Sequence, residues 1–427
     1  MKKVIVLSYF FTPCNLTASQ RALGWAKYLK EFGYYPIIIT RNWDLPIGKP
    51  EDAAISTGVE IIHEKNENYE VYYLPYKSSF RDRLYANQSK LVTFLRKGLT
   101  FFEMLFFNFT TRVLPYRNIY TFTKSYLKQN KEIDRLIITA SPFPIFRFGY
   151  LLNRKFGIKW LADYRDDWST CEARIYTSLE KFLNMFERNS ERKWINSASF
   201  ISTVSNHYRN KITNFTGKKG FTLLNGYFEE DFKDLKHVDS EVFTVVYNGS
   251  LYASQPVEKI LNAFKLFLDQ HNENKHLIQF VFAGTAYDKN QLNRINNVSK
   301  DFAENIVVTE RSPRKDILDL QCASHALIMI SHLNCKGIPS SKIYEYLAIG
   351  KPIISYPPDG DIIDETLENY NLGYVCSTEE MFANQLSELF KRFLNHKSNE
   401  LISDKEYVKS FSRRNQSKMT AEILDKI

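Results

Sequence analysis

Short runs of consecutive hydrophobic residues alternate along this chain with segments in which hydrophobic residues recur every three or four positions. Val4 to Ser8 and Tyr35 to Thr40 are two such runs, and each is short enough to be a buried strand. Between them the spacing predicts a helix from about Ser19 to Phe32, with a buried side formed by Ala22, Trp25, Ala26 and Leu29. A strand, a helix and a second strand at this spacing form a βαβ unit, whose crossover makes the two strands parallel. The pattern therefore predicts an α/β fold.

The same alternation continues through the chain with one interruption. Further strands are predicted at 136–139, 159–162, 200–204, 243–247, 278–283, 306–309, 326–330 and 353–356. A polar, charged run over 229–241 separates two sets of strands, and 427 residues are too many for one ordinary core. We therefore expect two doubly wound, Rossmann-like domains over 1–228 and 242–403, a linker at 229–241, and a C-terminal helix over 404–427 that crosses back to the first domain.

A predicted helix after the strand at 326–330 carries the most distinctive side chains of the second domain. Ser340, Ser341 and Lys342 stand at its start. Free backbone amides and the helix dipole favour an anion at such a position, and a serine hydroxyl can cap the first turn. Glu345 lies on the same face as Lys342, about one turn deeper. The pair could hold a nucleoside diphosphate, with the cation on phosphate and the carboxylate on sugar hydroxyls. An ordinary capped surface helix with a Lys–Glu pair fits these residues equally well.

Two segments of the first domain follow strands and are candidates for chemistry. Ligands of parallel sheets bind beyond the carboxyl ends of the strands, which places the loop from Tyr9 to Arg21 at the site. The strand at 159–162 runs into a second motif, whose candidate residues are Asp163, Arg165, Asp166 and Trp168. Carboxylates and an arginine there could position a hydroxyl nucleophile, balance a phosphate or bind a sugar. A structural Asp–Arg pair that orients the turn is the alternative.

Composition narrows the class of partner without choosing one. The formal net charge is +9, which suits phosphate-bearing ligands, an anionic membrane or nucleic acid. Nucleic acid is disfavoured, because the positive charge is dispersed and no basic run interleaves with aromatic residues. The five cysteines are scattered without a C-x-x-C pair, so the sequence indicates neither a zinc site nor a disulfide framework and favours a reducing cytoplasm.

The segment 96–112 combines aromatic and basic residues. Phe101, Phe102, Leu105, Phe106 and Phe109 fall at helical spacing, with basic residues on both sides. Such a helix can lie in the interface of an anionic membrane. The alternative is a helix that packs on its domain or covers the active site.

Several of these motifs resemble the retaining glycosyltransferases of family 4, which have the GT-B fold. The run PSSKIYEYLAIGKPII resembles the donor-binding segment of that family, and DYRDDW resembles the DxRDxW motif of a bacterial subgroup. The first loop resembles the YYxPP…R opening, and Asn225-Gly226-Tyr227 resembles the signature that closes the first domain. The resemblance covers nearly the whole chain. It implies two Rossmann-like domains facing a central cleft.

The resemblance also implies roles for individual residues. Glu345 would hold the donor ribose, but the second glutamate of the family motif is replaced by Gly337. Ser250 stands in place of the arginine that the family uses on the donor diphosphate, and no lysine follows it. The diphosphate would therefore rest on Lys342 and Arg311. The remaining donor-side contacts would come from Gly249, Ser250, Ser340 and Ser341.

The implied function is transfer of a sugar from a nucleotide sugar to a hydroxyl of a lipid-linked or polysaccharide acceptor, with retention. Asp163, Arg165 and Asp166 are the candidate catalytic residues, and the acceptor side would comprise Thr17, Ser19, Arg21 and Trp168. No D-x-D turn suggests a metal-held diphosphate, so we expect neither metal nor cofactor. The implied setting is bacterial cell-envelope glycan synthesis, in the cytoplasm or on the inner face of its membrane. A nucleotide-sugar epimerase or phosphorylase with the same two-domain shell, and a non-catalytic partner of such an enzyme, remain alternatives.

Overall fold

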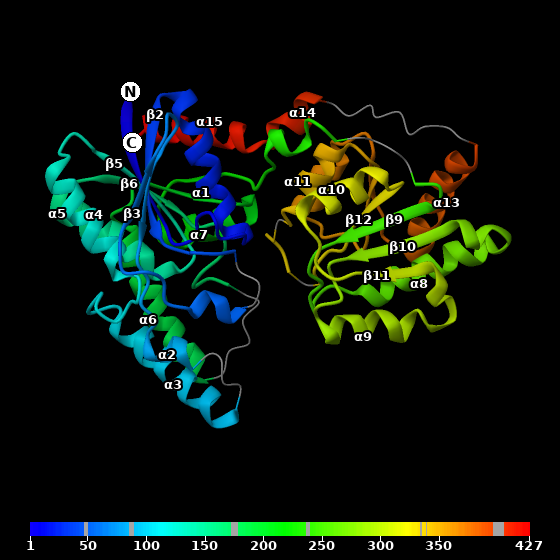
Figure 1. Cartoon of the computed structure of the whole chain (residues 1–427), viewed down its shortest axis with the longest axis horizontal. Helices are drawn as coiled ribbons and strands as arrows, with labels where there is room; N and C mark the ends of the chain where they lie inside the picture. The colour runs from blue at the N-terminus through cyan, green and yellow to red at the C-terminus, as the bar shows by residue number, and fades with distance from the viewer. Residues whose placement is uncertain are drawn as a thin grey trace. The chain divides into compact units, whose positions relative to one another are not determined.

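The computed structural model describes residues 1–46, 50–84, 89–171, 178–235, 240–333, 335–338, 340–395 and 405–427. The chain forms two compact units (Figure 1). Unit 1 contains residues 1–224 together with 413–427, and unit 2 contains residues 225–412. Each unit is built around one sheet of mainly parallel strands.

Unit 1 holds an eight-stranded sheet in the order β3-β4-β2-β1-β5-β6-β7-β8. The β1–β2 pair is parallel, as the βαβ spacing predicts, and only β3 runs antiparallel to its neighbour, β4. The antiparallel β3 is exposed along its whole length at the sheet edge. The strands are β1 (Lys2–Ser8), β2 (Tyr34–Arg41), β3 (Ile62–Lys65), β4 (Glu70–Leu74), β5 (Arg135–Thr139), β6 (Lys159–Asp163), β7 (Phe200–Thr203) and β8 (Gly220–Thr222).

Both faces of this sheet are covered, which explains why its central strands read as unbroken hydrophobic runs. Val4 and Val6 of β1 point to the face that packs against α1 (Thr17–Tyr28) and α15 (Arg413–Asp425). Ile5 and Leu7 point to the other face, where α4 (Arg117–Gln129), α5 (Phe146–Phe156), α6 (Ser178–Ile195) and α7 (Asn206–Thr216) contribute to the core.

The end of the chain completes unit 1. Trp25 of α1 donates from Nε1 to Oγ1 of Thr420 on α15 at 3.0 Å. The return to unit 1 begins at Arg413, nine residues later than the predicted 404, since α14 (Lys405–Ser410) belongs to unit 2. Residues 396–404, which contain the predicted boundary, lie outside the described part of the chain.

The boundary between the units also differs from the prediction. It falls after Leu224, so Tyr227 and Phe228 belong to unit 2 rather than to the first domain. The predicted linker at 229–241 begins with a short 3-10 helix, η4 (Glu229–Phe232), and residues 236–239 are not described. Asp231 in η4 forms an ion pair with Arg314, which holds this 3-10 helix on unit 2.

Unit 2 holds a wholly parallel six-stranded sheet in the order β11-β10-β9-β12-β13-β14. One face packs against α8 (Val257–Gln270) and α13 (Glu379–Leu394), while α10 (Arg314–Ala323) contacts β9 and α11 (Lys342–Ile349) contacts β12. The strands are β9 (Phe243–Asn248), β10 (Ile278–Ala283), β11 (Ile306–Val308), β12 (Ala326–Met329), β13 (Ile353–Ser355) and β14 (Gly373–Val375); the remaining helices are α9 (Lys289–Val298) and α12 (Ile362–Glu368).

The aromatic helix of unit 1 is shifted from its predicted position. It is α3 (Lys90–Phe106), which begins six residues before the predicted 96 and ends before 112. Ser89 caps its start by accepting from the backbone N–H of Val92 at 3.3 Å. The helix contacts α2 (Phe80–Arg83) and α6, yet none of its residues is buried. Within the described residues, no helix combines the length and the apolar character needed to cross a bilayer.

Candidate functional site

The strand order of each sheet predicts where a ligand would bind. In unit 2 the order reverses between β9 and β12, and in unit 1 it reverses between β1 and β5. Parallel sheets bind ligands in the crevice that opens at such a switch point, beyond the carboxyl ends of the strands. The loop after β9 and the segment that leads into α11 therefore form the candidate site of unit 2. In unit 1 the corresponding segments follow β1 and β5.

Lys342 joins these two segments of unit 2. Its Nζ donates to the hydroxyl of Tyr247 at 2.9 Å and to the carbonyl of Ser250 at 3.3 Å. Gly249 makes this approach possible: its φ is +95°, and a Cβ built there would lie 2.9 Å from Cε of Lys342. An ammonium has three donors, so the two bonds leave a third N–H for a ligand. The structure thus brings together Gly249, Ser250 and Lys342, as the sequence predicts.

The start of α11 differs in detail from the prediction. Ser341 occupies the N-cap position, but its backbone is helical and its side chain makes no capping hydrogen bond. The predicted cap is therefore wrong at Ser341, because a capping side chain needs an extended backbone. Ser340 and Ser341 directly precede α11 in the sequence, and both residues are half-buried. Pro339 precedes these serines in the sequence and also favours a helix start, but it lies outside the described residues.

Glu345 is held by an arginine that the sequence analysis did not single out. Nη1 of Arg314 lies 3.1 Å from Oε1 of Glu345, while its Nε and Nη2 lie 3.0 and 2.8 Å from Oδ2 of Asp231. The Glu345 side chain retains 14 % of its exposed surface, so one edge of the carboxylate is still open. An arginine held from two sides by carboxylates has a fixed orientation, and it fixes Glu345 in turn.

Arg311 and Ser250 are linked by a second residue that the sequence did not single out, Tyr287. The guanidinium carbon of Arg311 lies 4.1 Å from the centroid of the Tyr287 ring. The Tyr287 hydroxyl and Ser250 Oγ are 2.8 Å apart and share a hydrogen bond. Arg311 is exposed, so its charge is available at this end of the sheet. Tyr287 lies in the loop after β10, where nothing in the local pattern marks it.

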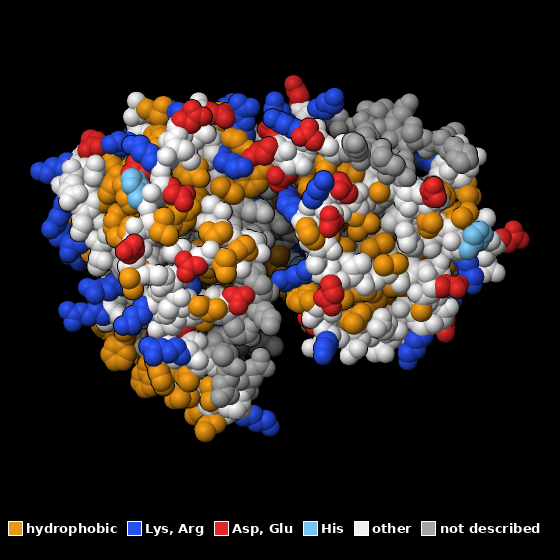
Figure 2. Space-filling view, in the orientation of Figure 1, with side chains coloured by type: hydrophobic (Ala, Val, Ile, Leu, Met, Phe, Trp, Pro, Cys, Tyr) orange, Lys and Arg blue, Asp and Glu red, His pale blue; other side chains and the backbone are white. Residues whose placement is uncertain are grey.

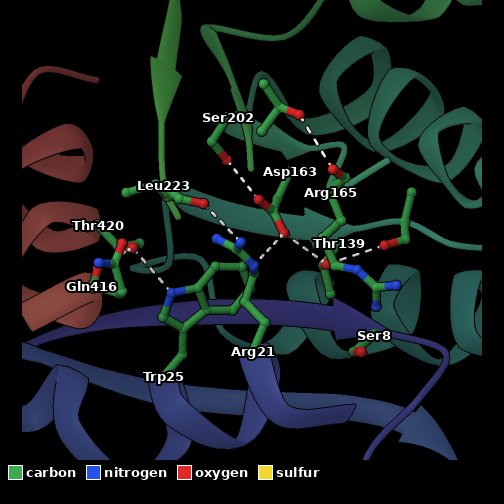
Figure 3. A network of polar contacts seen from close by, with 12 residues as sticks. Ser8, Arg21, Trp25, Thr139, Asp163, Arg165, Ser202, Leu223, Gln416 and Thr420 are labelled. Atoms are coloured by element: carbon green, nitrogen blue, oxygen red, sulfur yellow. Dashed lines mark hydrogen bonds and ion pairs between the residues drawn. The ribbon is translucent and has the colours of Figure 1, made fainter. Parts of the chain in front are cut away.

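In unit 1 the structure corrects the role expected for Asp163. Its side chain has no exposed surface, and its two oxygens accept from Thr139 and Ser202 at 2.8 Å each (Figure 3). Nε of Arg21, itself 3 % exposed, lies 3.6 Å from Oδ2, and Nη2 of Arg21 donates to the Leu223 carbonyl at 2.8 Å. This network ties α1 to the ends of β5, β6 and β7. Asp163 and Arg21 are thus placed as a structural pair, where neither can reach a substrate.

The structure also buries Trp168, which the sequence analysis expected on the acceptor side. Its side chain is 1 % exposed and stacks on Phe143 with ring centroids 5.1 Å apart. On the other side lies Trp194 at 5.9 Å, and Nε1 donates to Glu187 at 3.3 Å. Trp168 is therefore a core residue that packs the loop after β5 against α6, and it does not line an acceptor site.

Arg165 and Asp166 remain at the edge of the sheet. Arg165 has a left-handed backbone with φ of +56°, and its Nη1 donates to the carbonyl of Ala18 at 2.9 Å. Asp166 keeps 64 % of its side-chain surface exposed and lies 3.5 Å from Nη2 of Arg165. A left-handed non-glycine residue costs energy that the surroundings must offset, and such residues concentrate at functional sites. The pair reaches the start of α1, where Thr17 is exposed.

Ser19 does not present its hydroxyl to a ligand. Its Oγ donates to the carbonyl of Leu16 at 2.8 Å, and the residue is 4 % exposed. The hydroxyl thus closes the turn that begins α1. Of the four predicted acceptor-side residues, only Thr17 is exposed at the edge of the sheet.

A pocket at the end of β2 was not predicted. It encloses about 260 Å³ and places two carboxylates, Asp44 and Asp52, beside apolar side chains of Leu45, Pro46 and Ile55. Arg41 builds its wall, with the guanidinium carbon 3.4 Å from the centroid of the Tyr76 ring and 4.0 Å from that of Trp43. Carboxylates beside apolar groups are the usual composition of a small-molecule site.

Possible metal-ligating side chains do not gather in the described part of the chain. Among the described residues, no group of three or more His, Cys, Asp or Glu side chains is arranged to hold a metal ion. His332 pairs instead through Nδ1 with Ser254 Oγ at 2.7 Å. Burial, with Lys342 nearby, lowers the pKa of His332 below its usual value.

Known proteins match this chain in its fold and in the family of its second unit. Residues 228–413 match the model of the family described as Glycosyl transferases group 1. This segment contains the whole candidate site of unit 2, from Asp231 to Glu345. No curated protein matches the chain significantly.

Solved structures match over the full length. Sucrose-phosphate synthase from Thermosynechococcus elongatus aligns with a TM-score of 0.63 at 12 % identity, covering 100 % of this chain and 99 % of that one. A trehalose-6-phosphate protein from E. coli bound with UDP-2-fluoro glucose aligns with a TM-score of 0.64 at 12 % identity, with the same coverage. An α,α-trehalose-phosphate synthase from Burkholderia xenovorans in complex with glucose-6-phosphate gives 0.62 at 11 % identity, again covering 100 % and 99 %.

At these identities the structural matches establish the fold alone, which is the predicted GT-B fold. The family model identifies the domain that carries the donor-side candidates. The chain therefore has the GT-B fold, and the match of residues 228–413 to the group 1 glycosyl transferases supports a glycosyltransferase.

Proposed function

We propose that this protein is a retaining glycosyltransferase of family 4, in the subgroup with a DxRDxW motif. It transfers a sugar from a nucleotide-sugar donor to a hydroxyl of a lipid-linked or polysaccharide acceptor in bacterial cell-envelope glycan synthesis. One observation carries the proposal: the first turn of α11, at the switch point of unit 2, presents Lys342 and Glu345 on one side.

The donor diphosphate binds at the start of α11. Lys342 contributes its remaining N–H, and the helix amides, Ser340 and Ser341 contribute neutral donors. Arg311 adds a second cation from the loop after β11, which offsets the loss of the arginine at Ser250. Glu345 accepts from the ribose hydroxyls through the edge that Arg314 leaves open. Gly249 keeps the loop after β9 close enough to cover the phosphates.

The proposed mechanism needs neither a metal nor a cofactor. The acceptor hydroxyl attacks from the face that the diphosphate leaves, and the leaving diphosphate takes its proton. Cations and preorganised donors around the β-phosphate stabilise the charge that develops there. Lys342, Arg311 and the amides of α11 supply them. Arg165 and Asp166 at the edge of unit 1 are the candidates for orienting the acceptor, whereas Asp163 acts only through the fold.

The acceptor is proposed to be presented at the inner face of the cytoplasmic membrane, with the segment 96–112 on the membrane side. A soluble substitute allows the chemistry to be tested without lipid. One structural neighbour was solved with glucose-6-phosphate, so a sugar phosphate is the first such acceptor to try, together with short glycans.

A thermal-shift screen against nucleoside diphosphates and nucleotide sugars tests the donor site. A ligand that binds the native state raises the unfolding temperature as its concentration rises. We expect one nucleotide sugar to raise the Tm by several degrees at about 100 times its Kd. The shift should be lost in Lys342→Ala and Glu345→Ala but kept in Glu365→Ala, whose side chain is exposed on α12. No shift with any nucleotide sugar would contradict the proposal and favour a non-catalytic role.

A further inference from the structure

One side of α3 presents a hydrophobic stripe that no described part of unit 1 covers. Phe94 and Phe102 keep 77 % and 56 % of their surface exposed, and α3 has no buried residue along its 17 positions. The exposed apolar positions of this segment follow one another in steps of three, four and seven residues, so they share one face of the helix. The full stripe, called here the α3 stripe, comprises Leu91, Phe94, Leu95, Phe102, Phe106 and, just after the helix, Phe109.

A second helix widens the α3 stripe. α6 contacts α3 and exposes Phe182 and Met185 by 46 % and 51 % near its start. Figure 2 shows hydrophobic side chains gathered over α3 at the lower end of unit 1. Exposed apolar patches of several neighbouring large residues are uncommon on monomers and mark surfaces that bind something.

The helix α5 contacts α6, and α4 contacts α5; both α4 and α5 carry positive charge without acidic residues. α4 and α5 contain no Asp or Glu, and the positive charge of Lys124, with a smaller contribution from Lys128, lowers the pKa of Lys155. In Figure 2, Lys and Arg side chains lie along the left side of unit 1, above the hydrophobic side chains at its lower end. The group, called here the α4–α5 cations, comprises Arg117, Lys124, Lys128, Arg154 and Lys155.

The acidic residues of α3 and α6 do not neutralise this surface. Glu103 lies 2.6 Å from Arg81 of α2, and Glu191 accepts from the Tyr164 hydroxyl at 2.8 Å inside the core. Glu187 is buried against Trp168. Glu180 is the exposed carboxylate among the described side chains of the two helices. The surface therefore combines an apolar stripe with a field that is almost wholly positive.

We propose that the α3 stripe and the α4–α5 cations together bind an anionic lipid bilayer. This inference rests on the proposed function, in which the acceptor is membrane-bound, and it extends the membrane contact from one segment to a surface of four helices, α3, α4, α5 and α6. The stripe enters the boundary between headgroups and acyl chains, as amphipathic helices do. The cations are attracted to anionic headgroups within about a Debye length.

Charge decides between a bilayer and a second copy of this chain. Two copies that joined through the α3 stripe would bring two cationic surfaces together, and like charges at an interface oppose association. A bilayer with anionic lipid instead offers both an apolar layer and opposite charge. An anionic bilayer therefore complements both the apolar α3 stripe and the α4–α5 cations.

Vesicle co-sedimentation of the full chain tests the proposal. We expect binding to vesicles with about 30 % phosphatidylglycerol to exceed binding to pure phosphatidylcholine at least tenfold, and to weaken as salt rises. Phe94→Glu/Phe102→Glu should lower binding to the anionic vesicles at least tenfold, and Lys128→Glu/Lys155→Glu should remove most of the preference for anionic lipid. Met381→Glu/Leu394→Glu, at exposed apolar positions of α13 in unit 2, is the matched control and should bind as the wild type does.

The outcomes separate this inference from the proposed function. Equal pelleting of the wild type and Phe94→Glu/Phe102→Glu overturns the surface assigned here. A wild-type dimer that this variant dissociates, with no vesicle binding, overturns the bilayer in favour of a second copy. If the nucleotide-sugar shift persists in either case, the proposed function stands and only this inference fails. Vesicle binding by the wild type without any nucleotide-sugar shift would support this inference and contradict the proposed function.

Discussion

Replacing Asp163 with alanine is expected to lower the free energy of unfolding by about 3–5 kcal/mol, because it removes the buried carboxylate that faces the Arg21 guanidinium. Arg21 is 3 % exposed and lies 3.6 Å from the Asp163 carboxylate. Thr139 and Ser202 would also lose their acceptor. Urea denaturation, read from the midpoint at constant m-value, measures the loss.

Asp166 provides the matched control within the same motif. Its carboxylate is 64 % exposed, so Asp166→Ala should change stability by less than about 0.5 kcal/mol. If Asp163→Ala does not fold, Asp163→Asn keeps the shape and a hydrogen-bond acceptor while removing the charge, and it should still be clearly destabilised. A fully stable Asp163→Ala protein that has lost transfer activity would restore the catalytic role expected from the sequence.

Glu345→Ala is expected to lower kcat/KM for sugar transfer about a hundredfold. A hydrogen bond to a charged group contributes about 1.5–3 kcal/mol, and about 1.4 kcal/mol corresponds to a factor of ten in rate. Stability should change little, because Arg314 keeps its two contacts with Asp231. Initial rates with the donor found by thermal shift and a soluble acceptor measure the effect.

Two variants show whether the loss arises at the donor. Asp231→Asn loosens Arg314 but leaves Glu345 in place, so we expect a smaller loss, about tenfold or less. Glu365→Ala, on the exposed side of α12, should transfer at the wild-type rate. Unchanged kcat/KM in Glu345→Ala would show that this carboxylate does not contact the donor.

The two sheets were predictable because the sequence patterns that specify them are local. β1, β2 and β9 begin and end within two residues of their predicted positions. Buried strands read as hydrophobic runs, and the helix between β1 and β2 carries its buried residues at helical spacing. Ala22, Trp25, Ala26 and Leu29 are all buried, as predicted.

Burial of polar residues was harder to predict. Asp163 and Asp166 are the same residue type three positions apart, yet one has no exposed surface and the other is largely exposed. The difference arises from Arg21, which lies on α1 more than a hundred positions away. Trp168 is buried for a similar reason, since Phe143 and Trp194 meet it only in the folded chain.

The partners of the donor-side residues were likewise set by distant contacts. Arg314 reaches Glu345 across 31 positions, and Tyr287 reaches Ser250 across 37. Neither residue belongs to a motif, and no local signal marks Tyr287. An arginine in the first helical position after Pro313 is one weak sign, because cations are disfavoured at helix N-termini unless a carboxylate holds them. The Ser341 side chain fails to cap α11 because its backbone is helical.

Hydrogen exchange of the full chain, with and without a saturating nucleotide sugar, tests the central claim most directly. The claim is that the donor binds at the switch point of unit 2, between the loop after β9 and the start of α11. We expect slowed amide exchange at 248–251 and 340–346, with little change along β1 to β5 of unit 1. Protection confined to unit 1, or none in these two segments at saturation, would contradict the account.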